Sequence, residues 1–106
     1  MSSTNDWRLV SSHGAVLLFI VARPGCSVSE IAIGLGLTER SIWSLVMDMR
    51  RAGMLRTRRE RRRHLYSVDL DASFEVPRLG EFPLRDLLGR LAIRASDGSG
   101  HPAKVA

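Results

Sequence analysis

The sequence has a single cysteine, a single lysine and no long apolar run. Cys26 has no second cysteine to pair with, which excludes an internal disulfide framework. The longest apolar run, residues 15–22, is far shorter than the roughly 20 residues that a membrane-spanning helix needs. The first ten residues also lack the basic start and the small-residue cleavage site of a secretory signal. We therefore expect a cytoplasmic protein with no membrane partner.

The length of 106 residues gives room for one domain with its own hydrophobic core. We expect four segments: a flexible N-terminus at 1–6, a globular domain at 7–82, a C-terminal helix at 83–95 and a flexible tail at 96–106.

Positive charge is concentrated in one segment of the chain. Lys and Arg number 16 against 11 Asp and Glu, for a net charge of +5, and every basic residue except Lys104 is arginine. Residues 50–63 contain eight arginines and one glutamate, a formal +7, which leaves −2 for the rest. Such runs are often solvated surface or disordered tail, but this one lies between regularly patterned segments. Its position favours a structured basic surface.

The first predicted helix is apolar on all sides. It begins near Ser11 or Ser12 and ends before residues 23–25, because proline disfavours helical geometry in the residue before it. A helix without a polar face must be covered on more than one side, by its own domain or by a second subunit.

A second and a third helix follow with clear start and stop signals. Ser27 and Glu30 form a capping box at the start of the second helix, which ends around residues 34–36. The third helix covers residues 38–52, with Thr38 as its N-cap and Gly53 just beyond its end.

These two helices have the spacing of a helix-turn-helix. Small Ala32 lets the helices approach, Gly36 supplies the turn geometry, and Ile42 fills the space between them. We expect the remaining core positions of the unit to be Ile31, Leu35, Leu37 and Leu45.

After Gly53 the pattern predicts a hairpin and a last helix. Apolar or small residues alternate on either side of a basic tip at residues 60–62, which predicts two strands with one buried face: Leu55, Thr57, Tyr66, Val68 and Leu70. Pro83 is expected at the first position of the last helix. The apolar stripe of that helix is Leu84, Leu87, Leu88 and Leu91.

The outward face of the third helix is available to a DNA major groove, because its apolar stripe faces inward. We expect DNA contacts from Thr38, Glu39, Arg40, Trp43, Ser44, Met47 and Arg51. Arg40 is the preferred base-edge contact, since its guanidinium can pair with both acceptors of a guanine. For Trp43, contact with DNA and packing against the protein stay open as alternatives. In the hairpin, we expect contacts with phosphates or the minor groove from Arg58, Arg59, Arg61, Arg62 and Arg63.

Over about residues 7–93 the chain resembles the winged helix-turn-helix transcriptional regulators of the MarR/ArsR-like kind. The motifs that carry this are Ser12-His13-Gly14, Glu30-Ile31-Ala32, LTERSI at 37–42, DMRRAGML at 48–55 and RRERRRHLYSV at 58–68. The resemblance implies a mainly α fold with a small β-hairpin: a three-helix core, a wing and a C-terminal helix. Arg61 stands where related wings commonly carry glycine, and Trp43 where a polar residue is usual, so the target sequence is not carried over.

We therefore predict a bacterial, nucleoid-associated regulator that binds specific double-stranded DNA as a homodimer. The recognition helix 38–52 would enter the major groove, and the wing 56–66 would contact the flanking backbone or minor groove. The subunit interface is expected from Trp7, Leu17, Ile20, Leu84, Leu87, Leu88 and Leu91. A non-specific architectural DNA binder and a winged-helix protein adaptor remain alternatives. The operator, the regulated genes, and activation versus repression stay open.

No enzyme, metal or cofactor is expected. The three histidines and Cys26 have no metal-ligand spacing, and there is neither a nucleophile–base–acid arrangement nor a phosphate-binding loop. Cys26 precedes a helix N-terminus, where the dipole favours a thiolate, so a redox-active and an inert thiol both stay open. The effector, if there is one, is unknown, and at this length we expect it at the dimer interface.

Overall fold

A computed structural model of the chain describes residues 10–98, with side chains described up to residue 92. Its elements are α1 (Ser12–Ala22), α2 (Val28–Leu35), α3 (Glu39–Arg51), β1 (Leu55–Glu60), β2 (Arg63–Val68), β3 (Ser73–Val76), β4 (Gly80–Pro83) and α4 (Leu84–Gly98). The expected N-terminal segment, Trp7 and most of the expected C-terminal tail lie outside the described residues.

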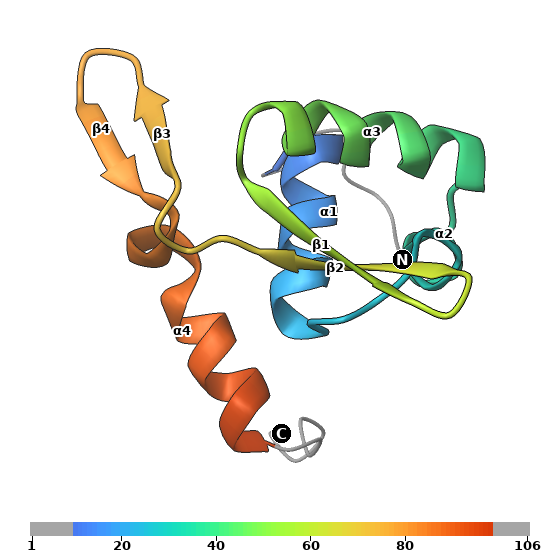
Figure 1. The fold of residues 1–106 in the computed structure, drawn as a ribbon. Helices are drawn as coiled ribbons and strands as arrows, with labels where there is room; N and C mark the ends of the chain where they lie inside the picture. The colour runs from blue at the N-terminus through green and yellow to red at the C-terminus, as the bar shows by residue number, and fades with distance from the viewer. Residues whose placement is uncertain (1–9, 99–106) are drawn as a thin grey trace, which may run out of the picture.

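Helix α1 lies at the centre of the molecule, with the other three helices and β2 packed around it (Figure 1). Ser11 caps it by accepting a hydrogen bond from the Gly14 amide at 3.1 Å. Val16 and Ile20 are fully buried. The apolar sequence of this helix is therefore covered by elements of its own chain, which is the first of the two arrangements that the sequence allows.

The helix-turn-helix is built as its spacing predicts. The Ser27 hydroxyl accepts from the Glu30 amide at 3.2 Å, and the Glu30 carboxylate accepts from the Ser27 amide at 2.8 Å. Gly36 ends α2 with a left-handed φ of +70°, and Ile42 is fully buried between the helices. The expectation that Leu37 occupies a core position is wrong. This residue is 43% exposed because it lies in the surface turn between α2 and α3.

The arginine-rich hairpin is formed by β1 and β2, and its turn consists of residues 61 and 62. The base of the hairpin is fixed to the segment before α2, because the Tyr66 amide donates to the Cys26 carbonyl at 2.8 Å and the Gly25 amide donates to the Tyr66 carbonyl at 2.9 Å. Leu65, on the opposite face to Tyr66, is buried as well. Both faces of this base are thus covered, where the sequence pattern predicted only one.

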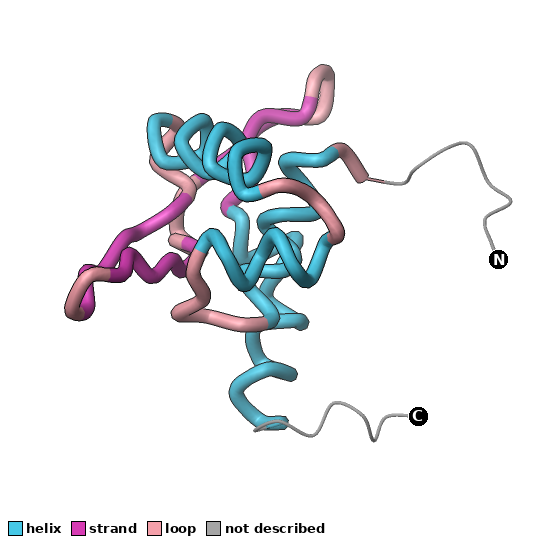
Figure 2. The backbone as a smooth tube through the Cα atoms, turned by 90° about the vertical axis from the view of Figure 1, so that its right-hand side faces the viewer, coloured by secondary structure: helices cyan, strands magenta, loops and turns pink. Residues whose placement is uncertain are grey.

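A second hairpin, β3–β4, was not expected from the sequence. Its strands have four residues each, and Phe74 pairs with Phe82 across them, with ring centroids 6.1 Å apart. Pro77 lies in its turn and Pro83 ends β4, and proline argues against a strand when a sequence is read alone. Figure 2 shows the two hairpins projecting from different sides of the helical body.

Helix α4 begins at Leu84, so the expectation of Pro83 as its first residue is wrong: Pro83 is still paired with Ser73 in the second hairpin. The first amides of α4 are satisfied by backbone carbonyls, Leu84 to Ala72 at 2.7 Å and Arg85 to Leu70 at 3.0 Å. The helix continues to residue 98, so residues 96–98 are helical and do not belong to a tail.

The architecture confirms the predicted three-helix core, basic hairpin and C-terminal helix, and adds the second hairpin. None of the helices between residues 10 and 98 has the length and hydropathy needed to cross a bilayer.

Candidate nucleic-acid interface

Helix α3 presents a polar face to solvent. Its inward stripe, Ile42, Val46 and Met49, is buried against α1 and α2. On the opposite side Arg40 and Ser44 are exposed, whereas Met47, which was expected on this face, is half-buried. The outward face therefore has a guanidinium and a hydroxyl available for hydrogen bonds near the start of the helix.

Trp43 lies on the same helix and is 56% exposed. A tryptophan that packed into the body of the protein would be largely covered, so the packing alternative from the sequence is not supported. The indole is available to a partner outside the chain.

The first turn of α3 is held by Thr38. Its hydroxyl oxygen accepts from the Ser41 amide at 3.1 Å, and the hydroxyl donates to Ser41 Oγ at 3.0 Å. Thr38 thus fixes the orientation in which Glu39 and Arg40 leave the turn. Because the Thr38 hydroxyl already has partners within the protein, it is less available for direct contact with DNA than the sequence suggested.

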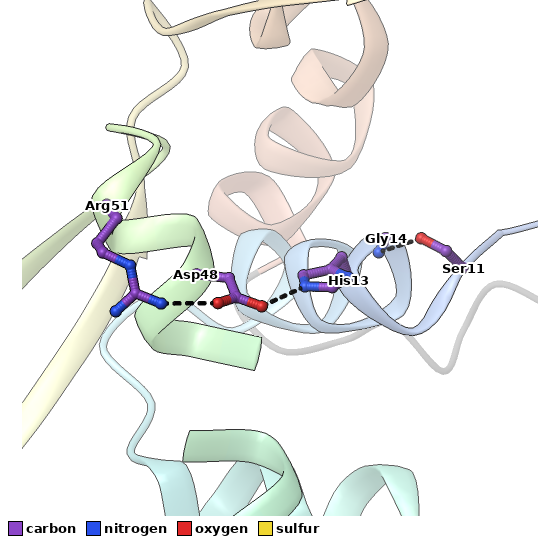
Figure 3. A network of polar contacts seen from close by, with 5 residues as sticks. All are labelled: Ser11, His13, Gly14, Asp48 and Arg51. Carbon is purple, nitrogen blue, oxygen red and sulfur yellow. Dashed lines mark hydrogen bonds and ion pairs between the residues drawn. The ribbon is translucent and has the colours of Figure 1, made fainter. Parts of the chain in front are cut away.

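A polar network links α3 to α1 (Figure 3). Asp48 bonds His13 Nε2 through Oδ2 and Arg51 through Oδ1, both at 2.9 Å. The hydrogen bond from His13, with a smaller contribution from Arg51, holds the pKa of Asp48 below its usual value. Sequence reasoning missed this network because His13 and Asp48 are 35 residues apart and have no shared motif. Arg51, expected to contact DNA, is tied to Asp48.

Neutralising this carboxylate should change how stability depends on pH. The pKa of Asp48 is lower in the folded state than in the unfolded state. The ionised carboxylate therefore stabilises the fold above the unfolded-state pKa, and this stabilisation is lost as pH falls through the folded-state pKa. We expect the difference in unfolding free energy between wild type and Asp48→Asn, measured by urea denaturation, to shrink as pH falls below about 4. Glu81→Gln, on the exposed face of β4, is the control. A difference that is the same at pH 5 and at pH 3 would contradict this role.

The basic hairpin carries its arginines on the surface. Arg58, Arg61 and Arg62 are exposed and form no ion pair with any described residue. Arg63 pairs with Glu30 at 3.7 Å, and Arg59 Nε donates to the Arg61 carbonyl at 3.4 Å. The five expected contact residues therefore fall into three unengaged guanidinium groups and two that already have partners.

The tip of this hairpin has an unusual backbone. Arg61 has a φ of +61°, a left-handed conformation that costs a side-chain-bearing residue roughly 1–2 kcal/mol. Glycine would avoid that cost. This chain instead places a charged side chain at the tip.

No protein family matches the chain, and no curated protein matches it in sequence. Among solved structures it is similar to a mutant form of ZitR from Lactococcus lactis, a winged-helix regulator, with a TM-score of 0.52 and 14% sequence identity. The alignment covers 98% of this chain and 60% of the ZitR chain. At this identity the likeness concerns the fold. The fold is a winged helix.

In this winged helix, β1–β2 is the wing, and its tip lies beside α2, on the side of the molecule where α3 begins (Figure 1). The unengaged arginines of the wing and Arg40 at the start of α3 are thus presented from neighbouring elements. Exposed like charges on neighbouring elements are stabilised when a polyanion binds them.

Most of the expected subunit interface belongs to the core of the winged helix itself. Leu17, Ile20, Leu84 and Leu88 are at most 8% exposed and pack against other elements of the same chain. The physical reason is that α4 closes over α1 and uses its leucine stripe there. Leu87 is 62% exposed and Leu91 is half-buried, and these two remain available for a partner.

Cys26 is buried at the start of α2. Burial, opposed by a weaker backbone hydrogen bond, raises the pKa of its thiol from 9.0 to about 11. The expected helix-dipole effect is outweighed, so the neutral thiol dominates near neutral pH and the redox-active alternative loses its chemical basis. Between residues 10 and 98, no three His, Cys, Asp or Glu side chains gather in a way that could hold a metal ion.

Proposed function

We propose that this winged helix is a transcriptional regulator that binds specific sites in double-stranded DNA. Helix α3 would enter the major groove, and the wing would contact the flanking backbone or minor groove. The observation that carries the proposal is the exposure of Arg40, Arg58, Arg61 and Arg62, four guanidinium groups without ion pairs among the described residues, on two neighbouring elements. The resemblance to MarR/ArsR-like regulators supports the same assignment.

The residues of α3 would divide the work of recognition. Arg40 would pair with a guanine edge, and the exposed indole of Trp43 would contact a thymine methyl group or the backbone. Ser44 would hydrogen-bond a base or phosphate, with Glu39 and Thr38 setting the entry of the helix. Arg51 would take part only after leaving Asp48.

A homodimer would place two α3 helices in successive major grooves about 34 Å apart on a pseudo-palindromic site. Of the apolar residues expected at the interface, Leu87 and Leu91 of α4 are the described ones that the core leaves accessible. We propose them, together with the predicted contribution of Trp7, as its apolar contacts. Charge at Leu87 should therefore separate the subunits and weaken DNA binding.

Two alternatives each have one observation in their favour. The charge at the wing tip favours a non-specific architectural DNA binder, because phosphate contacts alone carry no sequence information. Ile33, 80% exposed on α2, favours a protein adaptor, since it offers an apolar contact.

Selection from a pool of random duplexes at two salt concentrations tests the proposal, with wild type and Arg40→Ala compared. We expect a two-fold symmetric motif for wild type, and for Arg40→Ala a loss on that motif of about 1–3 kcal/mol, roughly 5- to 150-fold, with little change on random DNA. Arg90→Ala on α4 is the matched control, since it removes the same charge away from α3 and the wing. Salt-sensitive binding without a motif would favour the architectural alternative, and absence of DNA binding would favour the adaptor.

A further inference from the structure

A cavity of about 350 Å³ lies between the start of α1, the second half of α3, β3 and the start of α4. Six apolar side chains form most of its wall: Leu17, Met49, Met54, Phe74, Leu84 and Leu87. The volume falls within the roughly 300–1,000 Å³ of small-molecule sites, which are mostly apolar with a few polar groups. From the chain length we expected an effector only between subunits, whereas this cavity lies within one chain.

The polar end of the cavity carries a single carboxylate, that of Asp48. His13 and Asp48 are the ionisable residues in its wall, and they bond each other there at 2.9 Å. Arg51 occupies the other carboxylate oxygen of Asp48 and is absent from the wall. A ligand that reaches this end therefore meets a carboxylate oxygen whose present partner, an imidazole on α1, can be replaced.

We propose that the cavity binds a small amphiphilic amine. The aromatic or aliphatic body would lie among the six apolar side chains, and the ammonium group would donate to Asp48 Oδ2 in place of His13. An ammonium group brings a full positive charge and three N–H donors to the carboxylate, which favours the exchange. An anionic head group in the same place would be repelled by the Asp48 carboxylate.

Binding would act on α3 because the ligand replaces a contact between two helices. The His13–Asp48 bond ties α1 to α3, and Met49 of α3 lies in the cavity wall. An amine that breaks this bond changes the position or mobility of α3, so DNA and amine would alter each other's affinity by the same factor. This consequence rests on the proposed function, whereas the binding of the amine does not.

The binding step can be tested by amide chemical-shift perturbation with 2-phenylethylamine as the probe. Its matched analogues are 3-phenylpropionate, which is anionic, and 2-phenylethanol, which is neutral. We expect the amine at millimolar concentrations to shift the amides of residues in the cavity wall, and the anion to shift them least. The Asp48→Asn variant should bind the amine about tenfold or more weakly, whereas its affinity for the alcohol should be nearly unchanged.

Two further variants separate the cavity from the rest of the surface. Ala52→Phe adds an aromatic side chain to the wall and should abolish binding of both amine and alcohol, while Glu81→Gln on β4 should leave both unchanged. Equal binding of amine and anion, or shifts that map elsewhere, would overturn the proposal. Shifts of the Met49, Met54 and Phe74 amides on dilution without amine, away from the proposed interface on α4, would assign the cavity to a second copy and overturn the proposal as well. Amine binding in a protein that fails to bind DNA would leave the cavity site intact and refute only the proposed function.

Discussion

Alanine at Arg58, Arg61 and Arg62 together should lower the slope of log affinity against log salt concentration by about 2.7, because each phosphate contact contributes about 0.9. These three guanidinium groups have no ion-pair partner among the described residues, so all three are available to phosphates. The affinity for random duplex DNA should fall by two orders of magnitude or more at low salt. Fluorescence anisotropy at a series of salt concentrations measures both quantities.

The two engaged wing arginines provide the comparison. Arg63 must leave Glu30 and Arg59 must leave the Arg61 carbonyl before either binds a phosphate, so the double alanine variant should lower the slope by less than the roughly 1.8 expected for two free groups. Arg78→Ala with Arg90→Ala is a control for net charge. If that control lowers the slope by as much per charge removed as the triple variant does, the wing contributes no more to binding than other surface arginines.

Ile42→Ala should destabilise the protein by about 2–5 kcal/mol, because it leaves a cavity between α2 and α3. Ile42 is fully buried in the core cluster. A domain of this size has roughly 5–15 kcal/mol of stability in total, so the loss is large. Urea denaturation measures it, and DNA binding should weaken with it because the orientation of α3 depends on this contact.

Leu37→Ala is the matched comparison. Both residues were expected in the core from their spacing, but Leu37 is 43% exposed. Its truncation should cost less than about 1 kcal/mol, as is usual for surface positions. Similar losses at the two positions would mean that Leu37 is as well packed in solution as Ile42.

The start of each of the first three helices was predictable because a side chain marks it. Ser11, Ser27 and Thr38 each cap a helix through their own hydroxyl, and Gly36 ends one in the left-handed conformation. Such signals act within a few residues and can be seen in a sequence. The start of α4 carries no such mark, because distant backbone carbonyls satisfy its amides, and its position was accordingly misplaced by one residue.

The candidate site was predictable where it depends on exposed charge and not where it depends on tertiary contacts. The arginines of the wing stand out by composition alone. The Asp48 network, the engagement of Arg63 by Glu30 and the burial of Leu88 all require knowledge of which elements meet. An apolar stripe indicates that a helix packs against something, but it does not distinguish a neighbouring helix from a second subunit.

The backbone bridge between Cys26 and Tyr66 fixes the root of the wing, whereas the Arg63–Glu30 ion pair, at 3.7 Å between exposed side chains, is a weaker tie near its tip. The root has both hairpin and bridge hydrogen bonds, whereas the turn at residues 61 and 62 projects beyond the paired strands. A phosphate that takes Arg63 from Glu30 therefore breaks one ion pair near the tip and no backbone hydrogen bond at the root. The wing can exchange its partner at one end while it stays attached to the helix-turn-helix at the other.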